Sequence, residues 1–171
     1  SLVSSIQKEY DDLIISPEEA EQRFSDNSLL IIVDTHNANL VESRKLYEMA
    51  GQKIVIDHHR KSVNFIDDAV IFYHEPYASS ASEMVSEMIQ YFKNVNLVPQ
   101  VLAEALLAGI TLDTKNFVMK TGVRTFEAAA YLRKCGADTI KVKGFFTSPI
   151  EDYRKRSELI SDAEIIGSCA I

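Results

Sequence analysis

Three short apolar runs in the first half of the chain predict β-strands, at residues 29–34, 53–57 and 69–73. They are rich in Val and Ile, whose β-branched side chains favour extended backbone. Elsewhere, apolar residues recur at every third or fourth position, which predicts helices that pack by one face. Strands that alternate with helices are typical of an α/β fold, so we expect a parallel β-sheet flanked by helices.

Capping motifs locate several helix starts. In Ser16-Pro17-Glu18-Glu19 we expect Ser16 to be the N-cap of a helix and Glu19 to complete a capping box. Ser80 and Glu83 repeat this pattern ahead of an apolar stripe that predicts a helix to about residue 92. Further helices are expected at approximately residues 1–12, 41–50, 98–112, 125–133, 138–146 and 148–166.

Length and composition indicate one ordinary domain, because 171 residues with 46% hydrophobic content suffice for a sizeable core. We find neither an uninterrupted apolar run of membrane-spanning length nor a signal-peptide pattern at the start. The two cysteines, Cys135 and Cys169, lack metal-type spacing and form no disulfide framework, which favours a reducing cytosol.

The net charge of −7 argues against a broad basic surface for long nucleic acids or for an anionic membrane. We therefore expect neither partner for this chain. A phosphate-bearing substrate is still compatible with this charge, because bound divalent cations can supply positive charge locally.

Three apolar segments end in residues that can bind a metal. Asp34 follows the first strand, Asp57-His58-His59-Arg60 ends the second, and Asp113 follows an apolar run that begins at Leu106. Side chains at the carboxyl ends of parallel strands converge on one crevice. Because a hard divalent metal prefers carboxylate oxygens together with an imidazole, we expect Asp34, His58 and Asp113 to form one site.

Each of these residues taken alone also has an ordinary structural explanation. Asp34 could cap the next helix, Asp113 could end one, and the two histidines could be a structural pair in a loop. Only their combination favours a metal site. Of the other histidines, we expect His36 to be a solvated loop residue and His74 to have a structural hydrogen-bonding role.

Ser79 and Ser80 precede the helix expected after residue 80. We expect them mainly to cap this helix. They are also weaker candidates for substrate binding, because a helix N-terminus can hold a phosphate.

Three motifs in this order resemble a known family. Val33-Asp34-Thr35, Asp57-His58-His59-Arg60 and Leu112-Asp113-Thr114-Lys115 resemble the second, third and fourth motifs of the DHH phosphoesterase superfamily. Residues 75–80, 105–110 and 120–126 resemble one branch of it, the cyclic-di-AMP phosphodiesterases of Gram-positive bacteria. The resemblance covers nearly the whole chain. It implies a parent protein anchored in the cell membrane, with this domain in the cytoplasm and a DHHA1 domain after it.

The chain departs from the family pattern at both ends. The first motif, a strand followed by His-x-x-x-Asp-x-Asp, does not occur, and the Gly-rich motif of a DHHA1 domain is not found. We therefore expect residues 1–171 to be a partial DHH domain that lacks the first strand and the first motif. By itself it is expected to be inactive, to hold at most one metal ion and to self-associate through an uncovered sheet edge.

The resemblance also implies roles for the site residues. Two Mn²⁺ ions are expected per complete site, with Asp34 bridging them and His58 and Asp113 binding the second ion. Asp57 is expected to hold an imidazole in its ligating tautomer. His59, with Arg60, is expected to face the scissile phosphate, as a charge stabiliser or proton donor.

The substrate implied for the parent protein is cyclic di-AMP, which it would hydrolyse to linear 5′-pApA. Two alternatives are open at this point. One is an exonuclease for short oligonucleotides, similar to nanoRNases or to RecJ. The other is a catalytically inactive domain that binds a nucleotide as a sensor.

Overall fold

The computed structural model describes residues 2–92, 98–147, 150–166 and 169–170. Within these residues the main sheet has the order β1-β2-β3, formed by Leu29–Val33, Gln52–Asp57 and Ile71–His74. Both strand pairs are parallel, with Ile32 beside Val55 and Val55 beside Phe72. The predicted parallel sheet is therefore confirmed, and its three strands end at the same edge.

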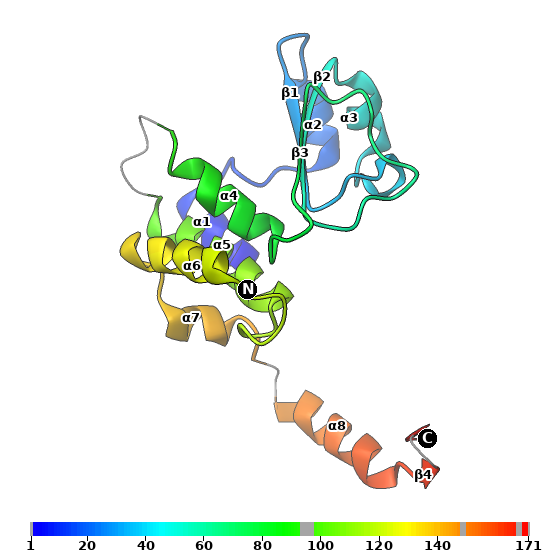
Figure 1. Cartoon of the computed structure of the whole chain (residues 1–171), viewed down its shortest axis with the longest axis vertical. Helices are drawn as coiled ribbons and strands as arrows, with labels where there is room; N and C mark the ends of the chain where they lie inside the picture. The colour runs from blue at the N-terminus through cyan, green and yellow to red at the C-terminus, as the bar shows by residue number, and fades with distance from the viewer. Residues whose placement is uncertain (1, 93–97, 148–149, 167–168, 171) are drawn as a thin grey trace.

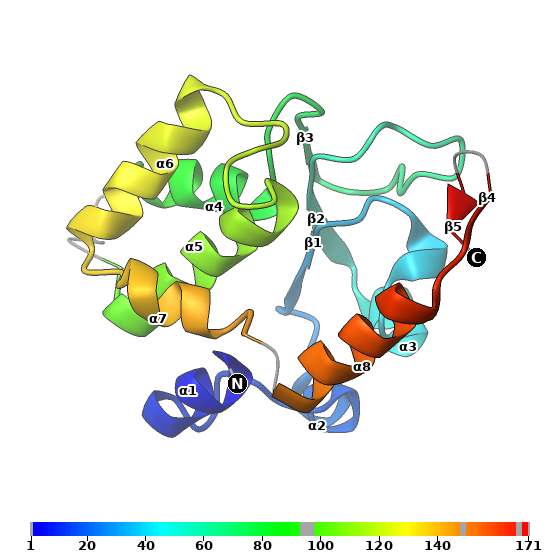
Figure 2. The ribbon, with the colours of Figure 1, turned by 90° about the horizontal axis from the view of Figure 1, so that it is seen from below.

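Helices cover the sheet on both sides (Figures 1 and 2). On one side lie α4 to α7, and on the other lie α2 and α3, so the molecule has the layered order expected of an α/β fold. The helices are α1 (Leu2–Glu9), α2 (Pro17–Arg23), η1 (Ala38–Leu40, a 3-10 turn), α3 (Arg44–Met49), α4 (Ala81–Ile89), α5 (Gln100–Asp113), α6 (Val123–Lys134), α7 (Thr139–Gly144) and α8 (Ile150–Asp162).

The central strand β2 connects two hydrophobic clusters because its side chains alternate between the two faces of the sheet. Val55 packs with Ile32 and Ile66 on the α3 side. Ile56 packs with Ala78 and Met84 on the α4 side. A third cluster lies within the helical layer, among α5, α6 and α7. Burial on both faces fixes β2, and with it the position of the Asp57-His58-His59 segment.

The outer strand β1 is covered on only one face. Ile32 is buried, whereas Leu29, Ile31 and Val33 are 45%, 52% and 51% exposed. β1 therefore presents an apolar face that the described residues leave uncovered.

Several element bounds differ from the predicted ones. The helix expected from about residue 41 begins only at Arg44, because residues 38–40 form a 3-10 turn and Ser43 caps the helix by accepting the Leu46 N–H. The last helix was expected to reach Ile166, which is wrong: it ends at Asp162, and β4 (Ile165–Ile166) pairs antiparallel with β5 (Cys169–Ala170). Its expected start at residues 148–149 lies outside the described residues.

No helix in the described part of the chain combines the length and apolar character needed to span a membrane.

Candidate metal centre

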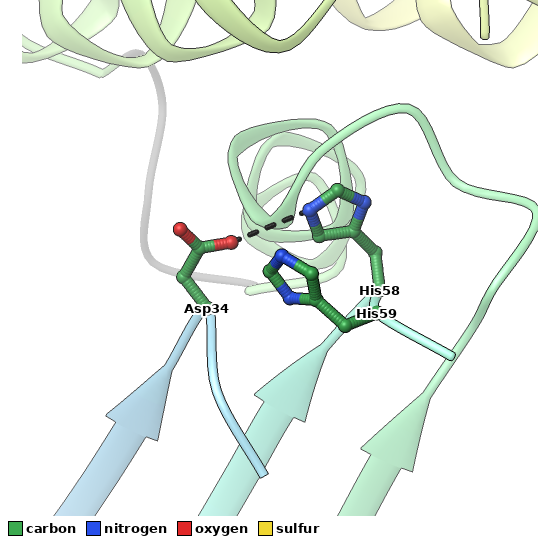
Figure 3. A group of neighbouring side chains, drawn as sticks. All are labelled: Asp34, His58 and His59. Carbon is green, nitrogen blue, oxygen red and sulfur yellow. Dashed lines mark ion pairs between the residues drawn. The ribbon is translucent and has the colours of Figure 1, made fainter. Parts of the chain in front are cut away.

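The three predicted metal-binding residues meet at one edge of the sheet. His58 Nε2 lies 3.4 Å from Asp34 Oδ1 and 3.7 Å from Asp113 Oδ2. Asp34 follows β1 and His58 follows β2, and their side chains face each other across the strand ends (Figure 3). Asp113 comes from the helical layer that packs on the sheet, as the last residue of α5. Two carboxylates and one imidazole thus converge from three elements, as the sequence predicted.

Asp34 reaches this position through an unusual backbone conformation. Its φ of 65° lies in the left-handed region, which aspartate tolerates better than most residues. Its N–H still donates to the carbonyl oxygen of Ile56 at 2.9 Å, so the residue stays attached to the sheet while the chain turns away. The turn therefore leaves the Asp34 side chain at the edge, where it is 58% exposed.

A backbone contact fixes the orientation of the His58 ring. Its Nδ1 lies 3.3 Å from the carbonyl oxygen of Ala78, which can only accept, so Nδ1 carries the proton and donates. The lone pair of Nε2 then points to Asp34 and Asp113. The ring is also buried, at 5% exposure.

Asp57 is fully buried and accepts hydrogen bonds on both carboxylate oxygens. Its Oδ1 accepts from the backbone N–H of His58 at 2.9 Å and from His59 Nδ1 at 2.7 Å, and its Oδ2 contacts His36 Nδ1. Asp57 therefore orients His59, the histidine expected to face substrate. His58, the histidine expected to bind a metal, is oriented by the carbonyl oxygen of Ala78, and the expected role of Asp57 stays a prediction.

His36 is buried, at 4% exposure, so the expectation of a solvated loop histidine is wrong. Its Nε2 accepts the N–H of Ser62 at 2.8 Å, which places the ring proton on Nδ1, where it is donated to Asp57. The two side chains stand 21 residues apart in the chain, so local sequence gave no sign of the pair. The alignment of β1 and β2 brings them together, because His36 comes shortly after β1 and Asp57 ends β2.

His74 has the structural hydrogen-bonding role that was predicted. Its Nε2 contacts the carbonyl oxygen of His59 at 2.5 Å. Ligand-type atoms of Asp34, His58 and His59 lie within 4.8 Å of one another, and those of His36, Asp57 and His74 form a second such group. In that group the Asp57 carboxylate and both His36 nitrogens already have hydrogen-bond partners, so these contacts account for it without a metal.

The pKa values of Asp57 and Asp113 are shifted in opposite directions from the ordinary value of an aspartate. Burial acts to raise the pKa of Asp57, but hydrogen bonds from His36 and His59 together outweigh it, so the pKa is lowered. The pKa of Asp113 is raised, first by desolvation and then by the negative charge of Asp34. Asp34 and Asp113 are thus close enough to repel each other, and a cation between them would relieve that repulsion.

His58 and His59 line a cleft of about 900 Å³. His59 is 54% exposed, and because its Nδ1 is bonded to Asp57, its Nε2 points away from that carboxylate. Arg60 lines the same cleft. Both residues predicted to face the phosphate are therefore placed beside the expected metal ligands, and their roles remain predictions.

Ser79 and Ser80 are buried at the start of α4. Ser80 Oγ accepts the N–H of Glu83 at 3.0 Å, which confirms the predicted cap, and Ser79 Oγ donates to the Glu83 carboxylate at 2.5 Å. Both hydroxyls are engaged in this capping arrangement. Their weaker candidacy for substrate binding stays a prediction.

Residues 2–110 match the family model described as "DHH family, N-terminal domain". The chain belongs to the DHH family. This agrees with the resemblance found in the sequence motifs, and the matched region contains Asp34 and the Asp57-His58-His59 segment.

Two curated relatives align along most of the chain. It is 43% identical over 152 residues to the cyclic-di-AMP phosphodiesterase PdeA of Listeria monocytogenes, covering 89% of this chain and 23% of the relative. It is 46% identical over 156 residues to the cyclic-di-AMP phosphodiesterase GdpP of Bacillus subtilis, covering 90% of this chain and 24% of the relative. The chain thus spans about a quarter of the length of these relatives.

A solved structure shares the fold at lower identity. An exopolyphosphatase-related protein from Bacteroides fragilis superposes with a TM-score of 0.73 at 20% identity, covering 94% of this chain and 46% of that protein. At this identity the likeness supports the arrangement of strands and helices and says nothing of the substrate.

Proposed function

We propose that the full-length protein containing this chain is a metal-dependent phosphodiesterase that hydrolyses cyclic di-AMP to linear 5′-pApA. The observation that carries this proposal is the convergence of Asp34, His58 and Asp113 beside an open cleft. The substrate is supported by the names of relatives that align over 89% and 90% of the chain.

The residues of the centre fit a hard divalent cation. Two carboxylates and one neutral imidazole are donors that such ions accept, and the raised pKa of Asp113 reflects a burial and a repulsion that a cation would offset. Asp34, His58 and Asp113 would hold the ion, and we propose Mn²⁺. When bound, it would supply positive charge to a phosphate and lower the pKa of a water molecule.

The chain's own residues divide the remaining tasks. His58 keeps its Nε2 lone pair directed at the centre because Nδ1 donates to Ala78. His59 is held through Nδ1 by Asp57, so its Nε2 can donate a hydrogen bond or a proton to a phosphate oxygen in the cleft. Arg60 can pair with phosphate oxygens as negative charge develops there.

We also propose where this domain lies in the cell. By its resemblance to the cyclic-di-AMP phosphodiesterases, we place this domain on the cytoplasmic side of a bacterial membrane, anchored by segments outside this chain. The length of the relatives, about four times that of the aligned region, is compatible with such additional segments.

A direct comparison of substrates tests the proposal. Purified full-length protein is incubated with Mn²⁺ and either cyclic di-AMP or linear pApA, and the products are separated by chromatography. We expect faster turnover of cyclic di-AMP, with pApA accumulating. Preferred cleavage of pApA would indicate an oligonucleotide exonuclease, and binding of cyclic di-AMP without any product would indicate a sensor.

The chain by itself is a separate test. We expect residues 1–171 alone to give no measurable turnover and to bind at most one divalent ion weakly, as the resemblance implies. Metal analysis after dialysis against Mn²⁺ measures the stoichiometry. Two tightly bound ions per chain, or turnover of cyclic di-AMP, would contradict this expectation while leaving the proposed substrate intact.

A further inference from the structure

The cleft beside the metal residues has two walls from separate parts of the chain. One wall is the turn after β3, with Pro76, Tyr77 and Ala78, and the other is the segment between α5 and α6, residues 118–122. His58 and His59 lie at the same cleft, so a substrate held at the metal residues would extend between these walls.

The segment that leads into this second wall, and Lys120 in the wall itself, have a strained backbone. Lys115, Asn116, Phe117 and Lys120 have φ values of 48°, 61°, 62° and 50°, in the left-handed region that non-glycine residues rarely adopt. Such conformations persist only where the surroundings enforce them, and they concentrate at functional sites.

Thr114 and an aromatic stack enforce this conformation. Thr114 is fully buried; its Oγ1 accepts the N–H of Phe117 at 2.9 Å, and its carbonyl oxygen accepts the N–H groups of Val118 and Met119 at 2.9 and 2.8 Å. The Phe117 ring stacks on Phe126 of α6, with centroids 5.6 Å apart and planes at 14°. The segment is thus fixed immediately after the metal residue Asp113.

Arg124 connects the two walls. Its guanidinium donates two hydrogen bonds to Glu87 at 2.7 Å each and lies 3.7 Å from Glu75 Oε2. Glu75 in turn accepts the N–H of Tyr77 at 3.3 Å through its other oxygen. These polar contacts connect the backbone of Tyr77 to the start of α6.

The contacts described above involve neither the ring of Tyr77 nor the ammonium group of Lys120. The Tyr77 side chain is 93% exposed although it lines the cleft, and Val118 on the other wall is 79% exposed. An exposed aromatic ring at the edge of a cleft is suited to stack on a planar base. Lys120 lines the same cleft as His58 and His59, which places its side chain beside the metal residues.

We propose that this cleft is a nucleotide subsite in which Tyr77 stacks on a nucleobase of the substrate and Lys120 pairs with a substrate phosphate. The inference rests on the proposed function, because it assumes that a phosphodiester is held at the metal residues. It adds the source of selectivity: the metal centre would accept any phosphodiester, whereas Tyr77 would select those that carry a base.

The test compares a substrate with bases and one without. Full-length protein with Mn²⁺ is assayed on cyclic di-AMP and on its doubly abasic analogue, in which hydrogen replaces each adenine. We expect Tyr77→Ala to raise the KM for cyclic di-AMP about tenfold, as loss of one stacking contact implies, with kcat nearly unchanged. The KM for the abasic analogue should not change, and Tyr77→Phe should behave as wild type.

Matched variants separate the subsite from general effects. Tyr153→Ala removes another exposed tyrosine, on α8, and should leave both KM values unchanged. Lys120→Ala should raise the KM for both substrates about equally, because both carry phosphate, and Lys120→Arg should restore it. Mn²⁺ affinity of Tyr77→Ala, measured by calorimetry, should equal that of wild type.

The outcomes distinguish this inference from the proposed function. Equal changes on both substrates, or no change, in Tyr77→Ala would overturn the base-stacking subsite while wild-type turnover still supports the enzyme. If wild type hydrolyses neither substrate, calorimetric binding of cyclic di-AMP decides: about tenfold weaker binding by Tyr77→Ala supports the subsite without the activity, and equal binding overturns it.

Discussion

The two sides of the metal centre are stabilised in different ways. On the strand side, Asp57 is fully buried, accepts hydrogen bonds from His36 and His59, and has a lowered pKa. On the helix side, Asp113 is 35% exposed, has a raised pKa, and leads into a segment with left-handed backbone that includes Lys120. On the strand side both carboxylate oxygens of Asp57 have hydrogen-bond partners, whereas Asp113 on the helix side lies close enough to Asp34 for their negative charges to repel each other.

This difference indicates that the two sides of the centre have different roles in binding. Hydrogen bonds within the strand side position His58 and His59 before anything binds, which lowers the cost of organising the site on binding. The helix side supplies the Asp113 carboxylate and a cleft wall that follows the segment fixed by Thr114 and Phe126. Substitutions on the two sides should therefore have distinguishable effects, which four predictions address.

The largest effect is expected when one carboxylate is removed from either side. Asp34→Ala or Asp113→Ala in the full-length protein should lower Mn²⁺-dependent phosphodiesterase activity by about a thousandfold or more, because water cannot replace a ligating carboxylate. Circular dichroism should show an intact fold in both. Activity within about tenfold of wild type in either variant would remove that residue from the metal set.

The next prediction concerns two adjacent histidines on the strand side. His58→Ala should weaken Mn²⁺ binding, because it removes a ligand whose Nε2 points at both carboxylates. His59→Ala should leave Mn²⁺ affinity unchanged and lower kcat by about a hundredfold, as loss of a proton donor implies. Calorimetry gives the affinities. Equal losses of metal affinity in the two variants would show that the proposed separation of their roles is wrong.

A smaller effect is expected from His36, which acts only through Asp57. His36→Phe fills a similar volume but leaves one carboxylate oxygen of a buried aspartate without its donor. It should destabilise the protein by about 1–3 kcal/mol and lower kcat more than it changes KM, because His59 loses its fixed orientation. His36→Asn can donate from its amide and should recover part of the kcat. Equal behaviour of the two variants would reduce His36 to a packing role.

The pH dependence of this destabilisation follows from the lowered pKa of Asp57. A carboxyl group whose pKa is lower in the folded state stabilises the fold above its ordinary pKa of 3.8, and this contribution is lost as the pH falls through the folded value. The stability difference between wild type and His36→Phe should therefore be full at about pH 7 and smaller at about pH 3. Urea unfolding at both pH values measures it, and a difference that grows towards low pH would contradict this.

The strand side was the more predictable of the two from sequence. Asp34 and His58 could be placed together because each follows an apolar run, and parallel strands end at one edge. The burial of His36 could not be predicted, because its partner Asp57 becomes its neighbour only when β1 and β2 align. A histidine in the polar segment Thr35-His36-Asn37 has the local character of a solvated loop residue.

The helix side was predictable only up to Asp113. An apolar run before an acid placed that residue, and the capping motifs placed the starts of α2 and α4. The left-handed conformation of Lys115 and Phe117 was not predictable from residue type, because Lys and Phe disfavour it and the sequence there contains no glycine. Contacts from Thr114 and Phe126 impose it, and these exist only in the folded chain.

The smallest effect is expected at the face of β1 that no other described residues cover. Leu29, Ile31 and Val33 are about half exposed, and in the described residues β1 pairs with β2 on one side and with no strand on the other. An edge strand of this kind tends to pair with another copy, so we expect weak self-association of the chain on its own.

Ile31→Lys should weaken this self-association about fivefold to tenfold, since it removes one apolar side chain from the contact and adds a charge. Ile140→Lys on α7, where the side chain is 82% exposed, is the matched control and should have no effect. Sedimentation velocity over a range of concentrations measures both variants; a wild-type chain that stays monomeric throughout would show that the face of β1 is tolerated without a partner.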